Sequence, residues 1–292
     1  VGAVGATAAE ILARAGLGRL VLVDRDIVDL SNLQRQGLYE ESDAREERPK
    51  ARAAAARLAA INPAVNLEAH VDDFAWDTAE DLAQGCDVLV DGTDNFATRY
   101  LLNDLARSSG RPWVYGACVG TTAAGAAFHP DGPCLRCLFP DPPDPGLLPT
   151  CETAGILASA AWAAGSLSAA AVLRCLTDPP DTTYLHNLDV WTADMERIEV
   201  VRDPNCPCCG TGTFPFLDGR DRSRTTVLCG RNAVQVSGRG QLSLVPLAER
   251  TGQTADPDCL RIPDGDLLVT LFATGRALVR GTENPERALA AY

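Results

Sequence analysis

The sequence predicts an α/β fold with a doubly wound, mainly parallel, Rossmann-like sheet, a structural zinc site and a small C-terminal α+β domain. A glycine turn at Gly2 and Gly5 runs into an Ala-rich amphipathic stretch and then into an apolar strand that ends at Asp24. Short apolar strands and helical stretches alternate as far as Ala117, which is typical of a parallel sheet with right-handed crossovers. Two C-x-x-C pairs, far apart in the chain, offer four thiols to one metal ion.

The first turn-helix-strand stretch predicts a nucleotide site. Gly2 and Gly5 allow backbone N–H groups at a helix N-terminus to approach a phosphate. Asp24 follows them by about 20 residues, where an acidic side chain accepts hydrogen bonds from a ribose hydroxyl. These residues alone indicate only that a nucleotide is bound.

Polar residues crowd the segment after this strand, where open α/β sheets bind their ligands. They are Asp26, Asn32, Gln34, Arg35 and Lys50. Arg35 is placed to clamp phosphate oxygens, Asn32 and Gln34 to hydrogen-bond phosphate or ribose, and Asp26 to assist a metal or the ribose. Cleavage of a triphosphate needs such groups, because charge developing on phosphate oxygens must be met by Arg, Lys or Mg²⁺. The alternative is that they are ordinary surface loop residues.

Lys50 stands out by composition. The chain has 26 basic residues, and all except Lys50 are arginine. One ammonium in an arginine-rich chain indicates that a compact point charge is needed at this position. The alternative is a chance surface lysine.

The next elements follow in order along the chain. The stretch 51–61 is predicted to be a helix stopped by Asn62 and Pro63, and 65–71 alternates as a half-buried strand with His70 on its polar face. The short strand 88–90 ends in Asp91 and Asp94, at the sheet edge where Asp24 and Lys50 are also expected. Asp94 could instead be the N-cap of the helix that follows.

The second half changes character. A buried strand at 113–120 leads into a β-rich stretch up to His129, and a proline-rich loop then precedes an apolar helix expected from Ala154. The segment from Pro140 to Thr150 is expected to act as a lid. The stretch 182–203 is predicted to be a strand pair. Beyond about residue 225 we expect a strand interrupted by a glycine turn, a hairpin and a final helix capped near Thr282 or Asn284.

The eleven cysteines indicate metal binding or chemistry more than disulfides, because the chain is large and shows no secretory signal. The expected zinc ligands are Cys134, Cys137, Cys206 and Cys209. Cys208 is interpreted as a bystander, and Cys86, Cys118, Cys175 and Cys229 as core residues. Cys151, expected at the start of the apolar helix, is either a reactive thiolate or a conventional helix-start residue.

Composition excludes several classes. The net charge of −13 and the lack of a basic stripe argue against a nucleic-acid partner. The uncharged stretch from Ala154 to Leu173 is interpreted as a close-packed buried helix, with a membrane span as the alternative, because Ala and Gly contribute little transfer energy. We therefore expect a cytoplasmic protein with no membrane partner.

The motifs GAVGATAAEILARAGLG, DRDIVDLSNLQRQ, RPKA, DGTDNFATR, TCETAG, and CLRC with NCPCCG together resemble the ThiF/MoeB/HesA family, the bacterial relatives of ubiquitin-activating enzymes. The resemblance covers residue 2 to about 218, and it implies an adenylyltransferase domain at 1–218 and a separate small α+β domain of unknown role at 225–292. The family pattern begins with a strand and an arm bearing an arginine, which are expected before Val1.

The resemblance also implies an activity. Members adenylylate the C-terminal glycine of a ubiquitin-like sulfur-carrier protein with a Gly-Gly tail, which activates the carrier for sulfur transfer. ATP would be the substrate, Asp94 would hold Mg²⁺, the two cysteine pairs would hold a structural zinc, and the protein would be a homodimer. Cys151 would serve, if at all, in a later thioester or persulfide step.

Two other functions remain open from the sequence. An NAD- or FAD-dependent oxidoreductase could use the same glycine turn and Asp24, although Arg35, Lys50 and the cysteine pairs argue against it. A non-catalytic scaffold could bind nucleotide and a carrier protein without turnover.

Overall fold

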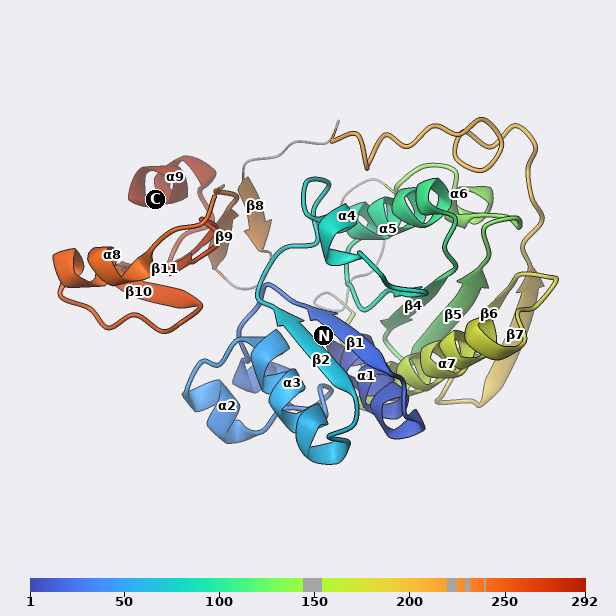
Figure 1. The fold of residues 1–292 in the computed structure, drawn as a ribbon, viewed down its shortest axis with the longest axis horizontal. Coiled ribbons are helices and arrows are strands. Elements are labelled where there is room, and N and C mark those ends of the chain that lie inside the picture. The colour runs from blue at the N-terminus through green and yellow to red at the C-terminus, as the bar shows by residue number, and fades with distance from the viewer. Residues whose placement is uncertain (144–153, 220–224, 229–231, 239) are drawn as a thin grey trace. The chain divides into compact units, whose positions relative to one another are not determined.

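The computed structural model describes residues 1–143, 154–219, 225–228, 232–238 and 240–292 (Figure 1). Contacts within the chain divide it into two units, Val1–Arg220 and Asp221–Tyr292, here called unit 1 and unit 2. Helical elements of unit 1 are α1 (Ala3–Ala15), η1 (Leu30–Asn32), α2 (Glu41–Arg45), α3 (Lys50–Ile61), α4 (Ala79–Leu82), α5 (Phe96–Ser109), α6 (Leu135–Leu138) and α7 (Ala158–Thr177). Its strands are β1 (Arg19–Val23), β2 (Asn66–His70), β3 (Leu89–Val90), β4 (Trp113–Val119), β5 (Thr122–Phe128), β6 (Tyr184–Asp189) and β7 (Asp194–Glu199).

The first half of unit 1 is built from parallel strands, as predicted. β1 pairs with β2, and β3 pairs with β4, each in parallel. Between β1 and β2, helix α3 ends at Ile61, and Asn62 forms its C-cap. Because the strands of each pair run in the same direction, their carboxyl ends and the loops that follow lie at one edge of that pair.

The second half corrects the prediction of a mainly parallel sheet. β4, β5, β6 and β7 are joined by antiparallel pairings in that order. A tight connection through Gly120, whose φ is +59°, separates β4 from β5. Such a turn can only reverse the chain, whereas a parallel partner needs a crossover connection. The predicted strand pair at 182–203 is confirmed as the β6–β7 hairpin.

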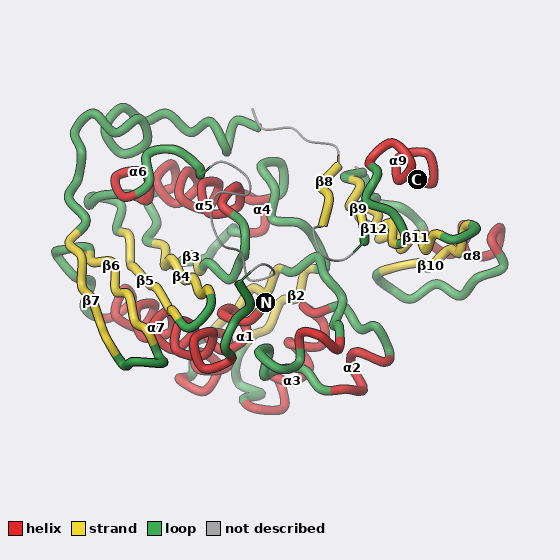
Figure 2. The backbone as a smooth tube through the Cα atoms, turned by 180° about the vertical axis from the view of Figure 1, so that it is seen from behind, coloured by secondary structure: helices red, strands yellow, loops and turns green. Residues whose placement is uncertain are grey.

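Helices cover β4 on both faces, as Figure 2 shows. Trp113 and Tyr115 point to the side of α5, where they join a core with Tyr100 and Leu105. Val114, between them, belongs to a different cluster with residues of α1 and α7. This alternation follows from the period of two in a strand, and it makes unit 1 a layered α/β structure.

Helix α7 is packed through small residues along one side. A Cβ atom added to Gly165 would lie 2.5 Å from Thr7 Cβ and 2.8 Å from Val4 O, so glycine is what allows α7 to approach α1 this closely. By length and composition alone, α7 is long and apolar enough to cross a membrane, and 39% of its 18-residue apolar window is buried. It therefore packs as a core helix with one exposed side.

The start of α7 differs from the prediction. The helix begins at Ala158, after Leu157 as N-cap, and not at Ala154. Gly155 has a φ of +73°, and Ile156 forms a bridge with Gly120. Residues 155–157 are thus held in extended pairing with the β4–β5 turn, which delays the first helical residue.

Unit 2 is an antiparallel sheet with helices on one face. Its strand order is β10-β11-β12-β9-β8, with bounds β8 (Thr225–Leu228), β9 (Ala233–Val236), β10 (Cys259–Asp264), β11 (Leu267–Phe272) and β12 (Ala277–Arg280). Its helices are α8 (Leu244–Thr251) and α9 (Pro285–Ala291). The predicted hairpin and the predicted N-cap Asn284 are confirmed; Asn284 accepts hydrogen bonds from the backbone N–H groups of Glu286 and Arg287.

Candidate functional site

The glycine turn lies against the loop that follows β3. Gly2 is the N-cap of α1, so no side chain caps the N-terminus of this helix at that position. A Cβ atom on Gly92 would lie 3.0 Å from Gly5 Cα, and one on Gly2 would lie 3.4 Å from Gly92 O. Glycine at position 92 lets its backbone approach that of Gly5 closely, so the N–H groups of α1 and the loop that carries Asp94 meet at one place.

Asp24, Asp26 and Lys50 form a connected group at the end of β1. Asp24 Oδ1 accepts a hydrogen bond from the backbone N–H of Asp26 at 2.8 Å, and Asp24 Oδ2 lies 2.7 Å from the nitrogen of Val1. Lys50, the first residue of α3, is 3% exposed, and its Nζ lies 3.2 Å from Asp26 Oδ2. The alternative of a chance surface lysine is therefore wrong.

Lys50 is also fixed through its backbone. Its N–H donates to the carbonyl of Asp26 at 2.9 Å, in addition to the ion pair of the side chains. Burial of an ammonium is costly unless a partner compensates the charge, so the pair sets the position of Lys50 closely. The result is a compact cation held at the carboxyl end of β1.

The segment 30–36 carries the amide side chains and the guanidinium that were predicted for the nucleotide site. Asn32 is buried and accepts a hydrogen bond from Gln36 Nε2 at 3.5 Å, while Gln34 is exposed. Arg35 donates to Ser31 O at 3.1 Å, and its own carbonyl accepts from Trp162 Nε1 of α7 at 3.3 Å. Gln36 was missed by the sequence reasoning; its backbone N–H donates to Asn32 O at 3.1 Å in the turn after η1, which brings the two side chains together.

The two aspartates of the loop after β3 lie in different environments. Asp91 is fully buried and accepts from Arg99 Nε at 2.9 Å and from Thr93 Oγ1 at 2.8 Å. Burial acts to lower the pKa of Arg99, but the charge of Asp91, the Tyr115 side chain and the hydrogen bond to Asp91 together outweigh it and raise that pKa. This ion pair, which the sequence did not predict, fixes the loop from inside.

Asp94, in contrast, is exposed. The N-cap of α5 is Asn95, whose side chain accepts from Thr98 N, so the alternative role of Asp94 as N-cap is wrong. Burial acts to lower the pKa of Arg25, but the charges of Asp73 and Asp26, the hydrogen bond to Asp73 and the charge of Asp94 together raise it. Because Arg25 adjoins Asp24, the carboxylate of Asp94 lies within electrostatic reach of the group at the end of β1, with its oxygens open to a cation.

Tyr39 also borders this region and was not predicted. Its hydroxyl donates to Val1 O at 2.7 Å. Burial, followed by the charges of Asp24 and Asp26, raises the pKa of Tyr39 well above its usual value. The tyrosine therefore stays neutral and remains a hydrogen-bond donor beside the two carboxylates.

The four predicted zinc ligands converge in unit 1. The sulfur atoms of Cys134, Cys137, Cys206 and Cys209 all lie within 4.8 Å of one another. Cys134 Sγ is 3.6 Å from Cys206 Sγ, and Cys137 Sγ is 3.3 Å from Cys209 Sγ. Tetrahedral zinc with bonds of about 2.3 Å holds its sulfurs about 3.8 Å apart, so this arrangement fits Zn²⁺ and is too wide for disulfides.

The thiols need a cation to ionise together. Burial, then hydrogen bonding to Cys137 and the charge of Cys134, raises the pKa of Cys209. Burial also acts to raise the pKa of Cys206, but hydrogen bonds from the backbone of Cys209 and Cys208 and from the thiols of Cys134 and Cys209 together lower that pKa. A bound divalent ion would compensate the repulsion among four thiolates, which makes the cluster consistent with a zinc site.

Two other predictions concern Cys151 and the expected lid at 140–150. Cys151 and part of the expected lid, 144–150, lie outside the described residues. Since α7 starts at Ala158, the premise that residue 151 stands at its N-terminus is wrong.

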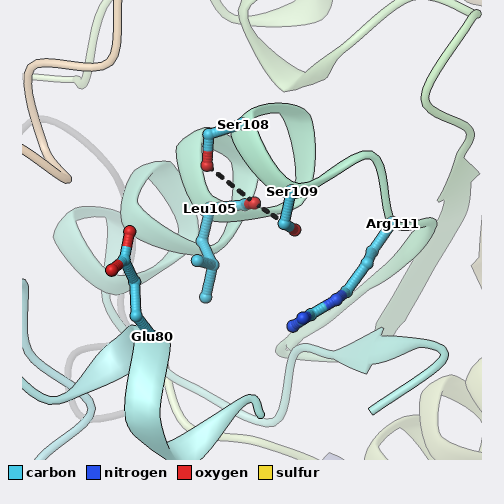
Figure 3. A pocket seen from close by; sticks show the side chains of 5 residues that line it. All are labelled: Glu80, Leu105, Ser108, Ser109 and Arg111. Atoms are coloured by element: carbon cyan, nitrogen blue, oxygen red, sulfur yellow. Dashed lines mark hydrogen bonds between the residues drawn. The ribbon is translucent and has the colours of Figure 1, made fainter. Parts of the chain in front are cut away.

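A cavity of about 300 Å³ lies between α4 and α5 and is lined by Glu80, Leu105, Ser108, Ser109 and Arg111 (Figure 3). The hydroxyls of both serines donate to Leu105 O. The cavity is at the C-terminal end of α5, a helix about 21 Å long whose other end carries the Asp94 loop. It contains none of the predicted site residues and is separate from the nucleotide site.

Together, the glycine turn and the carboxylates after β1 and β3 define a nucleotide-binding α/β protein, here with a four-cysteine cluster that fits zinc. The sequence model of the ThiF family matches residues 1–208, and the chain belongs to the ThiF family.

Relatives within this family are similar over most of the chain. The sulfur carrier protein ThiS adenylyltransferase of Bacillus subtilis is 38% identical over 301 residues, covering 100% of this chain and 89% of the relative. The SAMP-activating enzyme E1 of Haloferax volcanii is 40% identical over 222 residues, covering 75% of this chain and 82% of the relative. The sulfur carrier protein adenylyltransferase of Thermus thermophilus is 40% identical over 217 residues, covering 72% of this chain and 79% of the relative.

Solved structures agree on the fold. The crystal structure of E. coli MccB + ATP superposes with a TM-score of 0.62 at 20% sequence identity. The match covers 72% of this chain and spans 64% of that chain's length. The likeness shows that this chain has the α/β fold of MccB.

Proposed function

We propose that this protein adenylylates the C-terminal glycine of a ubiquitin-like sulfur-carrier protein at the expense of ATP, which activates the carrier for sulfur transfer. The observations that carry the proposal are the ion pair of the buried Lys50 with Asp26 at the end of β1, and the contact of the glycine turn with the loop that carries the exposed Asp94. Family membership and the names of the relatives, which are activating enzymes of carrier proteins, support the same reaction.

In this reaction the carboxylate oxygen of the terminal glycine attacks the α-phosphorus of ATP. The bond to the bridging oxygen breaks, and pyrophosphate leaves with its electron pair. Lys50 and Arg35 would stabilise the charge on phosphate oxygens, Asn32 would hydrogen-bond them, and Asp94 would hold Mg²⁺. Gly2 and Gly5 would present α1 N–H groups to phosphate, and Asp24 would accept from the ribose. Positioning and charge are sufficient for this step, and no covalent enzyme intermediate is required.

We further infer that the four-cysteine cluster holds one structural zinc ion and that the protein acts as a cytoplasmic homodimer. The sulfur distances and the clustered thiols support zinc. In the part of the chain that the structure describes, Cys134, Cys137, Cys206 and Cys209 supply the four sulfur ligands of a complete tetrahedral site, which is the pattern of a structural centre.

The decisive experiment is ATP–pyrophosphate exchange with a small carrier protein that ends in Gly-Gly. We expect exchange that depends on the carrier and on its terminal glycine, and none when that glycine is deleted. Binding of ATP and carrier with no exchange would indicate a scaffold. A change in reduced-cofactor absorbance on mixing would instead indicate an oxidoreductase.

Cys151→Ala is expected to leave pyrophosphate exchange unchanged. Attack by a carboxylate on the α-phosphorus needs no thiol, whereas capture of the acyl-adenylate does. The measurement compares exchange rates with the yield of any covalent adduct between protein and carrier, and only the adduct should be lost. Collapse of exchange in a folded Cys151→Ala protein would place this residue in the ATP site.

A further inference from the structure

One buried amide on α5 contacts the segments of both cysteine pairs. Asn103 is fully buried. Its Oδ1 accepts a hydrogen bond from the backbone N–H of Leu135 at 2.8 Å, and its Nδ2 donates to Cys208 Sγ at 3.2 Å. Leu135 directly follows Cys134, and Cys208 directly precedes Cys209. A single side chain therefore bridges two segments that lie far apart in the sequence.

The orientation of this amide is determined by its partners. The N–H of Leu135 can only donate, so the oxygen of the Asn103 side chain must face it. The NH₂ group is then left to the sulfur of Cys208, which accepts. Buried polar groups in folded proteins are almost always hydrogen-bonded, and both the oxygen and the nitrogen of this amide have a partner.

The same face of α5 holds the flanking segments. Asp104, also fully buried, accepts from the backbone N–H of Phe216 at 3.0 Å, and Tyr100 donates to Phe139 O at 2.7 Å. The Tyr100 and Phe216 rings lie 5.1 Å apart. Phe139 and Phe216 follow the two cysteine pairs in sequence. The residues that Asn103 contacts, Leu135 and Cys208, instead lie between the two cysteines of each pair.

We propose that Asn103 is a positioning residue of the four-cysteine centre, and that Cys208 serves as its sulfur acceptor and not as a metal ligand. Cys134 and Cys206 are 72 residues apart, so bringing the two pairs together costs chain entropy before any metal binds. Asn103, on helix α5, holds the two cysteine segments at a fixed position relative to each other. Residues that orient the ligands of a metal typically change its affinity by about 10–100-fold when they are removed.

The test is the rate at which purified protein releases zinc to a chromogenic chelator. Zinc content per chain is measured first, which separates a failure of the zinc assignment from a failure of the role of Asn103. Asn103→Ala and Cys208→Ala are expected to release zinc about 10–100-fold faster than the wild type. Cys208→Ser keeps an acceptor for Nδ2 and is expected to release zinc close to the wild-type rate.

Ser168→Ala is the matched control, because Ser168 is fully buried in unit 1 and its hydroxyl bonds to Ala164 O in α7, away from the cysteines. Its zinc release should equal that of the wild type. Wild-type release from Asn103→Ala would overturn the proposal. So would equally fast release from Cys208→Ser and Cys208→Ala, since a sulfur-specific effect would make Cys208 a ligand. If Asn103→Ala does not fold, the two Cys208 variants decide the question.

Discussion

Lys50→Ala and Asp94→Ala are each expected to abolish carrier-dependent pyrophosphate exchange, with a loss of at least about 10²–10³-fold in rate. The Lys50 side chain is buried and paired with Asp26, so water cannot replace its charge in the alanine variant. Asp94 is the exposed carboxylate at the same edge, and its loss would remove the proposed oxygen ligand of Mg²⁺. The rate is measured with saturating ATP and carrier.

Two substitutions sharpen this prediction. Lys50→Arg keeps the positive charge but not the compact ammonium, so exchange should stay well below the wild-type rate. Asp178→Ala removes an exposed carboxylate just after α7, away from the site residues, and should exchange normally. Circular dichroism confirms that each variant is folded. Wild-type turnover in a folded Lys50→Ala or Asp94→Ala protein would contradict the proposed site.

Loss of the metal is expected to unfold most of unit 1. Structural zinc contributes apparent free energies of about 10–16 kcal/mol, which is comparable to the whole stability of a domain. Even about 4 kcal/mol would lower the melting temperature of a domain of this size by about 8–16 °C. We therefore expect Cys134→Ala or Cys209→Ala to lack zinc by elemental analysis and to melt at a temperature lower by at least this amount.

Cys118→Ala provides the control for this experiment. Cys118 is a buried cysteine of β4 that lies outside the four-cysteine cluster. The Cys118→Ala protein should retain one zinc per chain, and its melting temperature should differ only slightly from that of the wild type. Native protein without tightly held metal, or Cys134→Ala melting like the wild type, would show that the cluster is not a structural zinc centre.

The parts of the fold that were predicted correctly depend on local patterns. The run after Lys50 forms α3 and ends where Asn62 was expected to stop it, and the period of two at 65–71 gave β2. In both cases neighbouring residues decide the structure, through capping and through the alternation of side chains. The cysteine pairs were also recognisable, because ligands of one ion come as closely spaced pairs.

Other features depend on partners that sequence spacing does not reveal. The β-rich stretch after Val119 was recognised, but its antiparallel direction was not: the turn at Gly120 reverses the chain before β5, and β6 then pairs antiparallel with β5. The late start of α7 follows from pairing of residues 155–157 with Gly120. Neither signal is present within the segment concerned.

The sequence by itself determined the glycine turn, the acidic residues at strand ends, the lone lysine and the four thiols, because each is a choice of residue type at a local position. Only the tertiary structure decided that Lys50 is buried against Asp26, that Asp91 pairs with Arg99, and that Asn103 bridges the cysteine pairs. Those are contacts of buried polar groups. Their stability depends on desolvation and on a partner brought near by folding, which no spacing along the chain records.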